Sequence, residues 1–511
     1  MHIPRCRAYA RVWPARKGFK TMTRDASNRR GYRQVAGLAE TGRYGEALEA
    51  IQRHLLDSPR DGEAFNDAGT ILHALGRFDE AAEHLKRAIA LLEGPSAAEA
   101  ERNLVEVYLA CDKPGEVEAL LEDLVGAGIL TADLANRSAN HLLKFGDLAG
   151  AAEALLRSLE ICPLQSPLTP VVENLRALRP KVAMFHPEGP SQALGQVRDF
   201  LARRFDVSLH HGQATDDLVR MLHGCDIAWF EDCTRQLVIA SKAAKRWRII
   251  CRLRLGGAYG PWMEQTRWEN VDALIVPPNR AILEYLRQRV GNLEGRTRLV
   301  IIPDGVDLAR FAFRRREAGK NLACIGRLDM RHNPMFLLQC FHRLHAADAA
   351  SRLFFAGMFT DDRIEQYLHH AVARMGLSAA VSFDGYQEDL PAWLADKHYV
   401  VSAEVAALQP TSVLEAMAAG LQPVVHDFPG AEDFLPPRSL YLTPEDFCRR
   451  ILDEPYEPQA CRDWVAARFA MKDTLTQING LMRELEKMPP LKVQPKDSYT
   501  AETASNRGGG A

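Results

Sequence analysis

Two segments in the last third of the chain carry residue types that suit the binding of a phosphate group. In "IGRLD", Gly326 comes where a strand is expected to end, and Arg327 follows it directly. A glycine there lets a phosphate approach the backbone, and the arginine supplies a fixed cationic fork. In "PTSVLEAMAAG", Ser412 and Glu415 have the S-x-x-E spacing of a helix capping box. The amides of Thr411 to Val413 would lie at the positive end of that helix, so we expect a diphosphate site at these two segments.

Four further residues extend this candidate site. Arg331 and His332, in "MRHNP", could both donate to a phosphate, although a histidine is only partly charged near neutrality. His426 and Gly430 follow the expected strand "QPVV" and could line the same pocket, and loop packing explains them equally well. Glu415 also has two interpretations, because one carboxylate can cap its helix, bind a ligand, or do both.

A second candidate region lies earlier in the chain, in "CRLRLGGAYG". Arg254 precedes Gly256 and Gly257, and these glycines could let a backbone approach a phosphate, with an ordinary loop as the simpler explanation. No G-x-G-x-x-G opens a helix, which disfavours a nicotinamide or flavin cofactor. The chain has no Asp-x-Asp and no convincing cluster of histidine ligands, so we expect neither a metal nor another cofactor.

Alternating β-rich and helical segments must position these residues. The strands expected before residue 280 are "KVAMF", "VSLHH", "CDIAWF", "RIICRL" and "VDALIVP". A second series is "NLACIG", "SRLFFAG", "AVSFDG", "HYVVSA", "LQPVVH" and "SLYL". This alternation is typical of parallel sheets flanked by helices, so we expect two doubly wound lobes, residues 180–300 and 301–486, with a cleft between them. Such sheets bind ligands at the carboxyl ends of their strands.

Helical repeats precede the lobes. A glycine, an aromatic residue or leucine, and an alanine recur with a period of 34 residues and one two-residue slip, as Gly42-Tyr44-Ala47, Gly76-Phe78-Ala81 and Gly146-Leu148-Ala151. In one unit Asp112 and Pro114 replace the glycine and the aromatic residue. The pattern resembles the tetratricopeptide repeat over residues 28–165 and implies an α-solenoid. Its groove would bind a protein or peptide partner, and a purely structural or oligomerising solenoid is an equal alternative.

Composition limits the partners and the location. The 511 residues include 64 Lys and Arg and 66 Asp and Glu, a net charge of -2, which gives no chain-wide attraction to nucleic acid. No stretch approaches the ~20 apolar residues of a membrane-spanning helix, and no secretory signal is present, so we expect a cytoplasmic protein. Residues 1–27 form a basic arm that we expect to be disordered, unless translation starts at Met22 rather than Met1. Residues 487–511 are polar and predict a disordered tail.

Four segments resemble a known enzyme family in their order and spacing. They are "IIPDGVDLARF", "IGRLDMRHNPMFLLQCF", "RLFFAGMF" with "VSFDGY", and "VSAEVAALQPTSVLEAMAAGLQPVVHDFPGAEDF". They resemble the donor half of the family-4 type, or group 1, glycosyltransferases, which have the two-lobed GT-B fold. The resemblance spans roughly residues 180–486. Together with the repeats, it implies a tetratricopeptide-like solenoid followed by a GT-B pair of lobes.

The resemblance also implies roles for the residues above. Arg327, His332 and Glu415 would be catalytic: Arg327 would stabilise a departing nucleoside diphosphate, His332 stands at the place of a lysine, and Glu415 would hold the ribose hydroxyls. The donor-binding set would be Gly326, Arg331, Thr411, Ser412, Val413, His426 and Gly430, and the acceptor side would hold Arg254, Gly256 and Gly257.

Three positions depart from the family pattern. His332 replaces the lysine, Ala407 replaces a glutamate that contacts the donor sugar, and Arg254 stands where the family has a histidine. Glu404 lies three residues too early to replace the missing glutamate unless the loop is remodelled.

The resemblance implies transfer of a sugar, with retention, from a nucleotide-sugar donor to a protein or glycan acceptor docked near the repeats. One alternative is a catalytically degenerate scaffold or interaction module, which the three departures favour. A second alternative is a protein O-glycosyltransferase.

Overall fold

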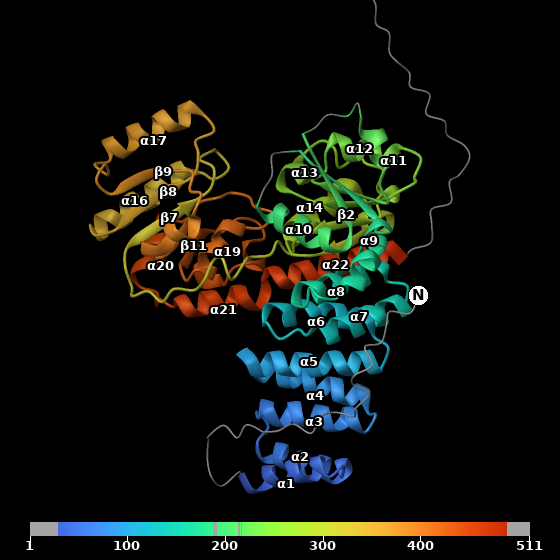
Figure 1. Cartoon of the computed structure of the whole chain (residues 1–511). Coiled ribbons are helices and arrows are strands. Elements are labelled where there is room, and N and C mark those ends of the chain that lie inside the picture. Colours follow the sequence, from blue (N-terminus) through green and yellow to red (C-terminus); the bar gives the residue numbers. More distant parts are fainter. Residues whose placement is uncertain (1–28, 93, 188–191, 213–214, 216, 488–511) are drawn as a thin grey trace, which may run out of the picture. The chain divides into compact units, whose positions relative to one another are not determined.

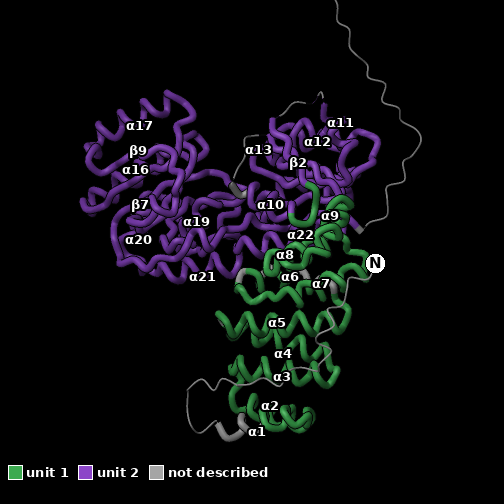
Figure 2. The backbone as a smooth tube through the Cα atoms, viewed as in Figure 1, with its two compact units in different colours: residues 1–179, 203–206 green, residues 180–202, 207–511 purple. Residues whose placement is uncertain are grey.

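The computed structural model describes residues 29–92, 94–187, 192–212, 215 and 217–487. It divides into two compact units, one of residues 1–179 and 203–206, the other of residues 180–202 and 207–511 (Figure 2). The arm expected at residues 1–27 and the expected tail after Lys487 lie outside the described residues. Within the described ranges, no helix is long and apolar enough to cross a membrane.

The first unit is a stack of helices that pack as consecutive neighbours (Figure 1). The alanines of the repeat pattern, Ala47, Ala81 and Ala151, are fully buried in its core, where a small side chain lets helices approach closely. The helices are α1 Arg29–Glu40, α2 Tyr44–Asp57, α3 Gly62–Ala74, α4 Phe78–Leu91, α5 Gly94–Ala110, α6 Pro114–Gly126, α7 Ala132–Lys144, α8 Leu148–Ile161 and α9 Thr169–Ala177.

The turns between paired helices share one backbone conformation. Gly42, Gly76 and Gly146 have φ values of 77°, 73° and 76°, in the left-handed region that glycine adopts most easily. Asp112 has a φ of 58° at the corresponding turn, and its carboxylate pairs with Lys144 at 2.9 Å. Aspartate tolerates this conformation better than most residues, so the turn forms without its glycine.

The helical region runs further than residue 165, where the sequence pattern places its end. Helix α9 follows, and Leu168, Val172 and Leu175 are buried in the same hydrophobic core as the repeats. Pro163 ends the repeat pattern, but Pro170 lies in the first turn of α9, where a proline does not disturb a helix.

The second unit contains two six-stranded sheets. The first lobe has the strand order β2-β1-β3-β4-β5-β6, with parallel pairing from β1 through β6. Its strands are β1 Lys181–His186, β2 Asp206–His211, β3 Ile227–Glu231, β4 Arg248–Arg252, β5 Ala273–Val276 and β6 Arg298–Ile301. Its helices are α10 Gln192–Arg204, α11 Leu218–His223, α12 Arg235–Lys242, α13 Leu255–Tyr259, α14 Arg280–Val290 and α15 Leu293–Arg296. The five expected strands are present, and β6 is one that the sequence reading missed.

The second lobe has the order β12-β11-β10-β7-β8-β9, again parallel. Its strands are β7 Asn321–Ile325, β8 Arg352–Ala356, β9 Val381–Gly385, β10 Tyr399–Ser402, β11 Gln422–His426 and β12 Leu440–Tyr441, which are the six expected. The helices are α16 Pro334–Ala347, α17 Asp362–Arg374, α18 Leu390–Trp393, α19 Thr411–Ala418, α20 Pro444–Leu452, α21 Pro458–Arg468 and α22 Met471–Lys487.

The chain passes between the two lobes twice. It leaves β6 through residues 302–320 and returns after α21, where Val306 and Ala470 form a parallel bridge. The return helix α22 is tied to the start of β6 by an ion pair between Glu484 and Arg298. Thr474 of the same helix donates to the carbonyl of Pro303 at 3.1 Å.

Candidate functional site

The loop after β7 begins with a close approach of two backbones. Gly326 has a φ of 146°, and a Cβ there would lie 3.0 Å from the His332 ring. Gly357, after β8, has a φ of 151°, and its Cβ would lie 1.8 Å from the carbonyl oxygen of Gly326. Both positions therefore need glycine because the protein's own atoms fill the space that a side chain would take.

Arg327 is the exposed cation of this loop. Its side chain is 61% exposed, and its ion pair within the described residues is a long one, 3.9 Å from Nε to Asp329 Oδ2. Such a contact contributes little to stability. The guanidinium therefore keeps donors that can be directed at an anion.

Arg331 and His332 lie in a charged cluster with two carboxylates. Asp329 Oδ1 accepts from the amide of His332 at 2.9 Å and lies 2.7 Å from its Nδ1. Arg331 Nη2 lies 2.8 Å from His332 Nε2, and Arg331 Nη1 donates to Glu404 and, at 3.1 Å, to the carbonyl of Ala406. The loop between β10 and α19 thus brings Glu404 to these two residues, although sequence spacing placed it outside the site.

These contacts define the protonation of His332. Arginine can only donate, so Nε2 accepts from Arg331 and the ring proton lies on Nδ1, where it faces Asp329. Burial lowers the pKa of His332, and Arg331 lowers it further, against the raising effect of Asp329. His332 is therefore neutral at pH 7 in this arrangement and supplies no positive charge.

The start of α19 differs from the expected capping box. The helix begins at Thr411 with Pro410 as its N-cap, so Ser412 lies inside the first turn and makes no cap; its hydroxyl donates instead to the carbonyl of Ile325 at 3.4 Å. This contact holds the first turn of α19 against the carboxyl end of β7. The amide of Thr411 donates to Gln409, whereas the amides of Ser412 and Val413 have no acceptor in the described part of the chain.

Glu415 lies one turn further along α19 and is half-buried. Its carboxylate makes no hydrogen bond or ion pair with any described residue, so the interpretation in which Glu415 caps its helix is not the one observed. Burial raises its pKa to about 7, with Asp307 adding to the rise and Arg310 opposing it. A half-buried carboxylate with a raised pKa and no side-chain partner is more typical of a ligand-binding site than of a purely structural position.

Two predicted donor-binding residues have protein partners. A Cβ on Gly430, which has a φ of 89°, would lie 2.3 Å from Asn279 Oδ1. Asn279 caps α14 and donates to the carbonyls of Ala407 and Leu408 at 3.1 and 3.2 Å. Gly430 and Ala407 thus lie against the first lobe's Asn279, and packing accounts for both. His426 packs edge-on to Phe336 and Tyr441, and its Nδ1 is buried without a hydrogen bond to a described residue.

Arg254, predicted on the acceptor side, belongs to a buried network in the first lobe. It pairs with Glu231 and, at 2.6 Å, with Asp304, and Arg252 pairs with the same two carboxylates. Burial would raise the pKa of Asp304, but Arg254 and Arg252 more than offset this and hold it at about 2. Gln409 donates to the carbonyl of Asp304 at 2.6 Å and accepts from its amide at 2.9 Å, which joins the network to the loop before α19.

Gly256 and Gly257 lie against a carboxylate rather than an open space. Asp232 accepts from the amides of Cys233, Arg254 and Gly257 at 2.8–2.9 Å. Burial raises the pKa of Asp232 to about 6, in spite of these three hydrogen bonds. The anion position that the sequence suggested for a phosphate is therefore taken by an aspartate of the protein itself.

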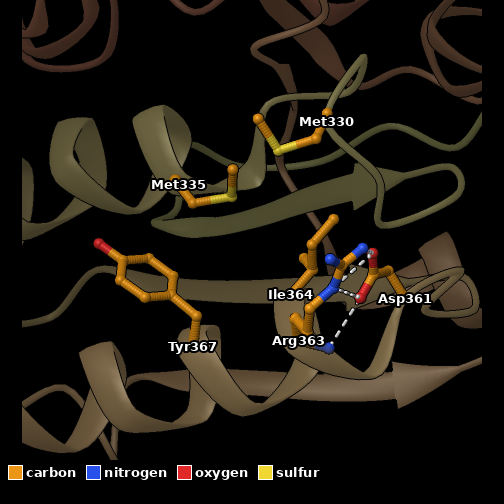
Figure 3. Close-up of a pocket in the computed structure, with 6 residues that line it drawn as sticks. All are labelled: Met330, Met335, Asp361, Arg363, Ile364 and Tyr367. Atoms are coloured by element: carbon orange, nitrogen blue, oxygen red, sulfur yellow. Dashed lines mark hydrogen bonds and ion pairs between the residues drawn. The ribbon is translucent and has the colours of Figure 1, made fainter.

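A separate pocket of about 470 Å³ lies between the β7 loop and α17 (Figure 3). Met330 and Met335 face Ile364 across it, and an ion pair joins Asp361 to Arg363 at its edge. Tyr367 completes the lining. Sequence reasoning predicted none of these residues, because their types carry no distinctive spacing.

Comparisons with known proteins add to this geometry. Residues 319–453 match the family model described as glycosyl transferases group 1, and residues 32–98 match a tetratricopeptide repeat model. No curated protein matches the chain.

Solved structures also resemble the chain. Anabaena HepE in complex with UDP is 15% identical, with 60% of this chain and 100% of that chain covered and a TM-score of 0.51. HepE with UDP and glucose is 16% identical over the same shares, also with a TM-score of 0.51. Sucrose-phosphate synthase from Thermosynechococcus elongatus is 16% identical, with 60% and 99% covered and a TM-score of 0.50. At these identities the likeness concerns the fold, and the predicted fold, a tetratricopeptide region followed by two GT-B lobes, is confirmed.

Proposed function

We propose that this chain, which combines a group 1 glycosyltransferase domain with tetratricopeptide repeats, transfers a sugar from a nucleotide-sugar donor to an acceptor hydroxyl. The observation that carries the proposal is the meeting of β7 and α19. The Ser412 contact to Ile325 places the amides of Ser412 and Val413, which have no acceptor among the described residues, beside the loop that holds Arg327, and Glu415 lies one turn further along the helix. This one region therefore offers amides and a cation that can bind a phosphate, and a carboxylate that can accept hydrogen bonds from the two hydroxyls of a diol.

Each group has a distinct task in this proposal. The amides of Ser412 and Val413 would bind a phosphate at the positive end of α19, and Arg327 would turn its exposed fork to the diphosphate. The carboxylate of Glu415 would accept hydrogen bonds from the two ribose hydroxyls. This role agrees with the absence of any hydrogen bond from a described residue to that carboxylate.

The transfer step exchanges one bond for another. The acceptor oxygen bonds to the anomeric carbon while the bond from that carbon to the diphosphate oxygen breaks. The bonding pair leaves with the diphosphate, which takes the acceptor's proton. Arg327 would stabilise the charge that develops on the leaving group, a contribution that is usually large in such reactions. We propose that the configuration at the anomeric carbon is retained, as the family resemblance implies.

A UDP-sugar is the donor to test first, because the HepE structures contain UDP. We propose that no metal takes part, since the chain has no Asp-x-Asp to bridge a metal to a diphosphate. The acceptor would be a protein or a glycan that the repeats hold, which raises its effective concentration near the donor without any new catalytic contact.

A catalytically degenerate scaffold is the second candidate, and specific observations favour it. Ala407 stands at the position of the sugar-binding glutamate and is buried under Asn279, and Arg331 is already paired with Glu404. A protein O-glycosyltransferase is the third candidate, and it differs from the first in its acceptor.

The test is a panel of UDP-glucose, GDP-mannose and ADP-glucose added at millimolar concentration to the full chain. We expect at least one of them to raise the melting temperature and to be hydrolysed or transferred. Arg327→Ala should remove most of this stabilisation and weaken donor affinity by about tenfold or more. The melting temperature of the variant without donor should be unchanged, because the side chain of Arg327 is exposed. No stabilisation by any donor would overturn the proposal, and stabilisation without turnover would favour the scaffold.

A further inference from the structure

Glu404 reaches the cationic loop through a connection that involves backbone as well as side chains. The amide of Val405 donates to the carbonyl of Arg331 at 3.0 Å, and Arg331 donates back to the carbonyl of Ala406. The side chain of Glu404 is 11% exposed, whereas that of Arg331 is 31% exposed. The arginine side of the pair is therefore open to a ligand, although the carboxylate is nearly enclosed.

The cluster carries no net charge. Arg327 and Arg331 supply two positive charges, Asp329 and Glu404 supply two negative charges, and His332 is neutral. The diphosphate of a nucleotide-sugar brings two negative charges of its own. If Glu404 stayed on Arg331, the diphosphate would meet a carboxylate in a partly buried place, where like charges repel strongly.

Replacement of the carboxylate resolves this repulsion. A guanidinium binds a phosphate with the same planar fork that it offers a carboxylate. When Arg331 turns to a phosphate, His332 Nε2 loses its donor and faces an anion, and Nδ1 still faces Asp329. An imidazole with an anion on each side is stabilised in its protonated form.

We propose that Glu404 is a counter-ion that the donor's diphosphate displaces from Arg331, and that His332, positioned by Asp329, takes up a proton in the same step. The charged groups that face His332 are Asp329, Arg331 and Arg327 from its own loop and Glu404 from the loop after β10. This inference rests on the proposed function. It makes His332 a conditional replacement for the family's lysine, with a positive charge that is present only while phosphate is bound.

The first test removes the charge of Glu404 and keeps its shape. The probe is the panel donor that stabilises the protein most, together with its free nucleoside diphosphate. In Glu404→Gln we expect both to bind about three- to tenfold more tightly by calorimetry, because no carboxylate competes for Arg331. The matched control is Glu317→Gln, which alters an exposed carboxylate with no ion pair in the described part of this unit and should leave affinity unchanged.

The second test measures proton uptake. The diphosphate of a nucleotide-sugar does not titrate between pH 6 and 8.5, so a change in affinity over this range comes from the protein. His332→Lys carries a permanent charge, and the ratio of the wild-type to the variant dissociation constant should rise with pH, by at most about tenfold per unit for one proton. Titration of Glu415 is common to both proteins and cancels in the ratio. Asp329→Asn removes a charge that raises the pKa of His332. The pH dependence of donor affinity in this variant should therefore shift to lower pH.

The outcomes separate this inference from the proposed function. If no panel member binds the wild type or either variant, both are overturned. If donors bind but Glu404→Gln changes nothing, the displacement is overturned and the function stands. If Glu404→Gln weakens the nucleotide-sugar and not the free diphosphate, Glu404 contacts the sugar and the displacement is again overturned. A ratio that is constant with pH overturns the proton uptake.

Discussion

Both lobes of the second unit gather arginines and carboxylates near the carboxyl ends of their central strands, yet the two clusters differ in how completely they are paired. In the first lobe, Arg252 and Arg254 both pair with Glu231 and Asp304. In the second lobe, Arg327 has a 3.9 Å contact and Glu415 has no partner within the described residues.

This difference separates a stabilising cluster from a binding one. Buried ions with complete partners can hold a structure together, because each removed partner leaves an uncompensated charge. Ions and amides without partners are costly to keep, and their presence indicates a ligand that completes them. The residue types are the same in both lobes, so the pairing, rather than the arginine itself, identifies the site.

The largest expected effect is on the paired cluster. Asp304→Asn keeps the size of the side chain but leaves Arg252 and Arg254 with one carboxylate fewer, so we expect a loss of about 3 kcal/mol in unfolding free energy by urea denaturation. A loss below about 0.5 kcal/mol, as expected for the exposed control Glu317→Gln, would show that the network does not stabilise the lobe.

The pH dependence of the same residue has a defined sign. The folded pKa of Asp304, about 2, is below its ordinary value of 3.8. Its ionised form therefore stabilises the protein above pH 4, and that stability is lost as the pH falls from about 4 to about 2. The variant should lack this step in an acid titration followed by circular dichroism.

A smaller effect on the free energy of unfolding is expected for Gly257, whose amide donates to Asp232. A Cβ on Gly257 would lie 2.0 Å from Asp232 Oδ1, whereas one on Gly256 would lie 3.4 Å from Oδ2. We expect Gly257→Ala to cost about 2 kcal/mol, since Asp232 must leave the amides that it binds, and Gly256→Ala to stay within about 0.5 kcal/mol. Equal melting temperatures for the two variants would contradict the role assigned to Asp232.

The smallest stability effect, and one of opposite sign, is expected in the second cluster. The folded pKa of Glu415, about 7, is above its ordinary value of 4.5, so its ionised form destabilises the fold as the pH rises through this interval. Glu415→Gln should therefore raise the melting temperature by a few degrees at pH 8 and leave it nearly unchanged at about pH 4, below the ordinary pKa of the carboxyl group.

The same variant should bind nucleotide-sugars several-fold more weakly, because one oxygen no longer accepts a hydroxyl. A fall in melting temperature at both pH values would instead assign Glu415 a structural role and would remove the contrast between the clusters.

Sequence reasoning succeeded where periodicity sets the structure. The 34-residue repeat predicted helix pairs, and alternating apolar runs predicted the strands that follow. It missed β6 because Arg298–Ile301 has only four residues and runs directly into the turn that follows. It also ended the solenoid at the proline after α8, although α9 continues the same core.

Within the site, the sequence predictions failed where they depended on the spacing of residues in the chain. The S-x-x-E pattern predicted a cap, but Pro410 takes the N-cap position, so Ser412 is shifted into the helix. Glu404 was rejected by counting residues, which cannot follow a loop whose path changes. The partners of Arg254 lie 23 and 50 residues away in the sequence, and no local pattern connects them.

The double crossing between the lobes has a consequence for how the second unit responds to proteolysis. Arg314 and Arg315, in the first crossing, are exposed and open to trypsin. A cut there would divide the chain into two fragments, but they would stay associated without a covalent link, because α22 of the second fragment returns to the first lobe and its Glu484 pairs with Arg298 of β6. The nicked protein would thus separate from the intact one on a denaturing gel and migrate with it on a sizing column.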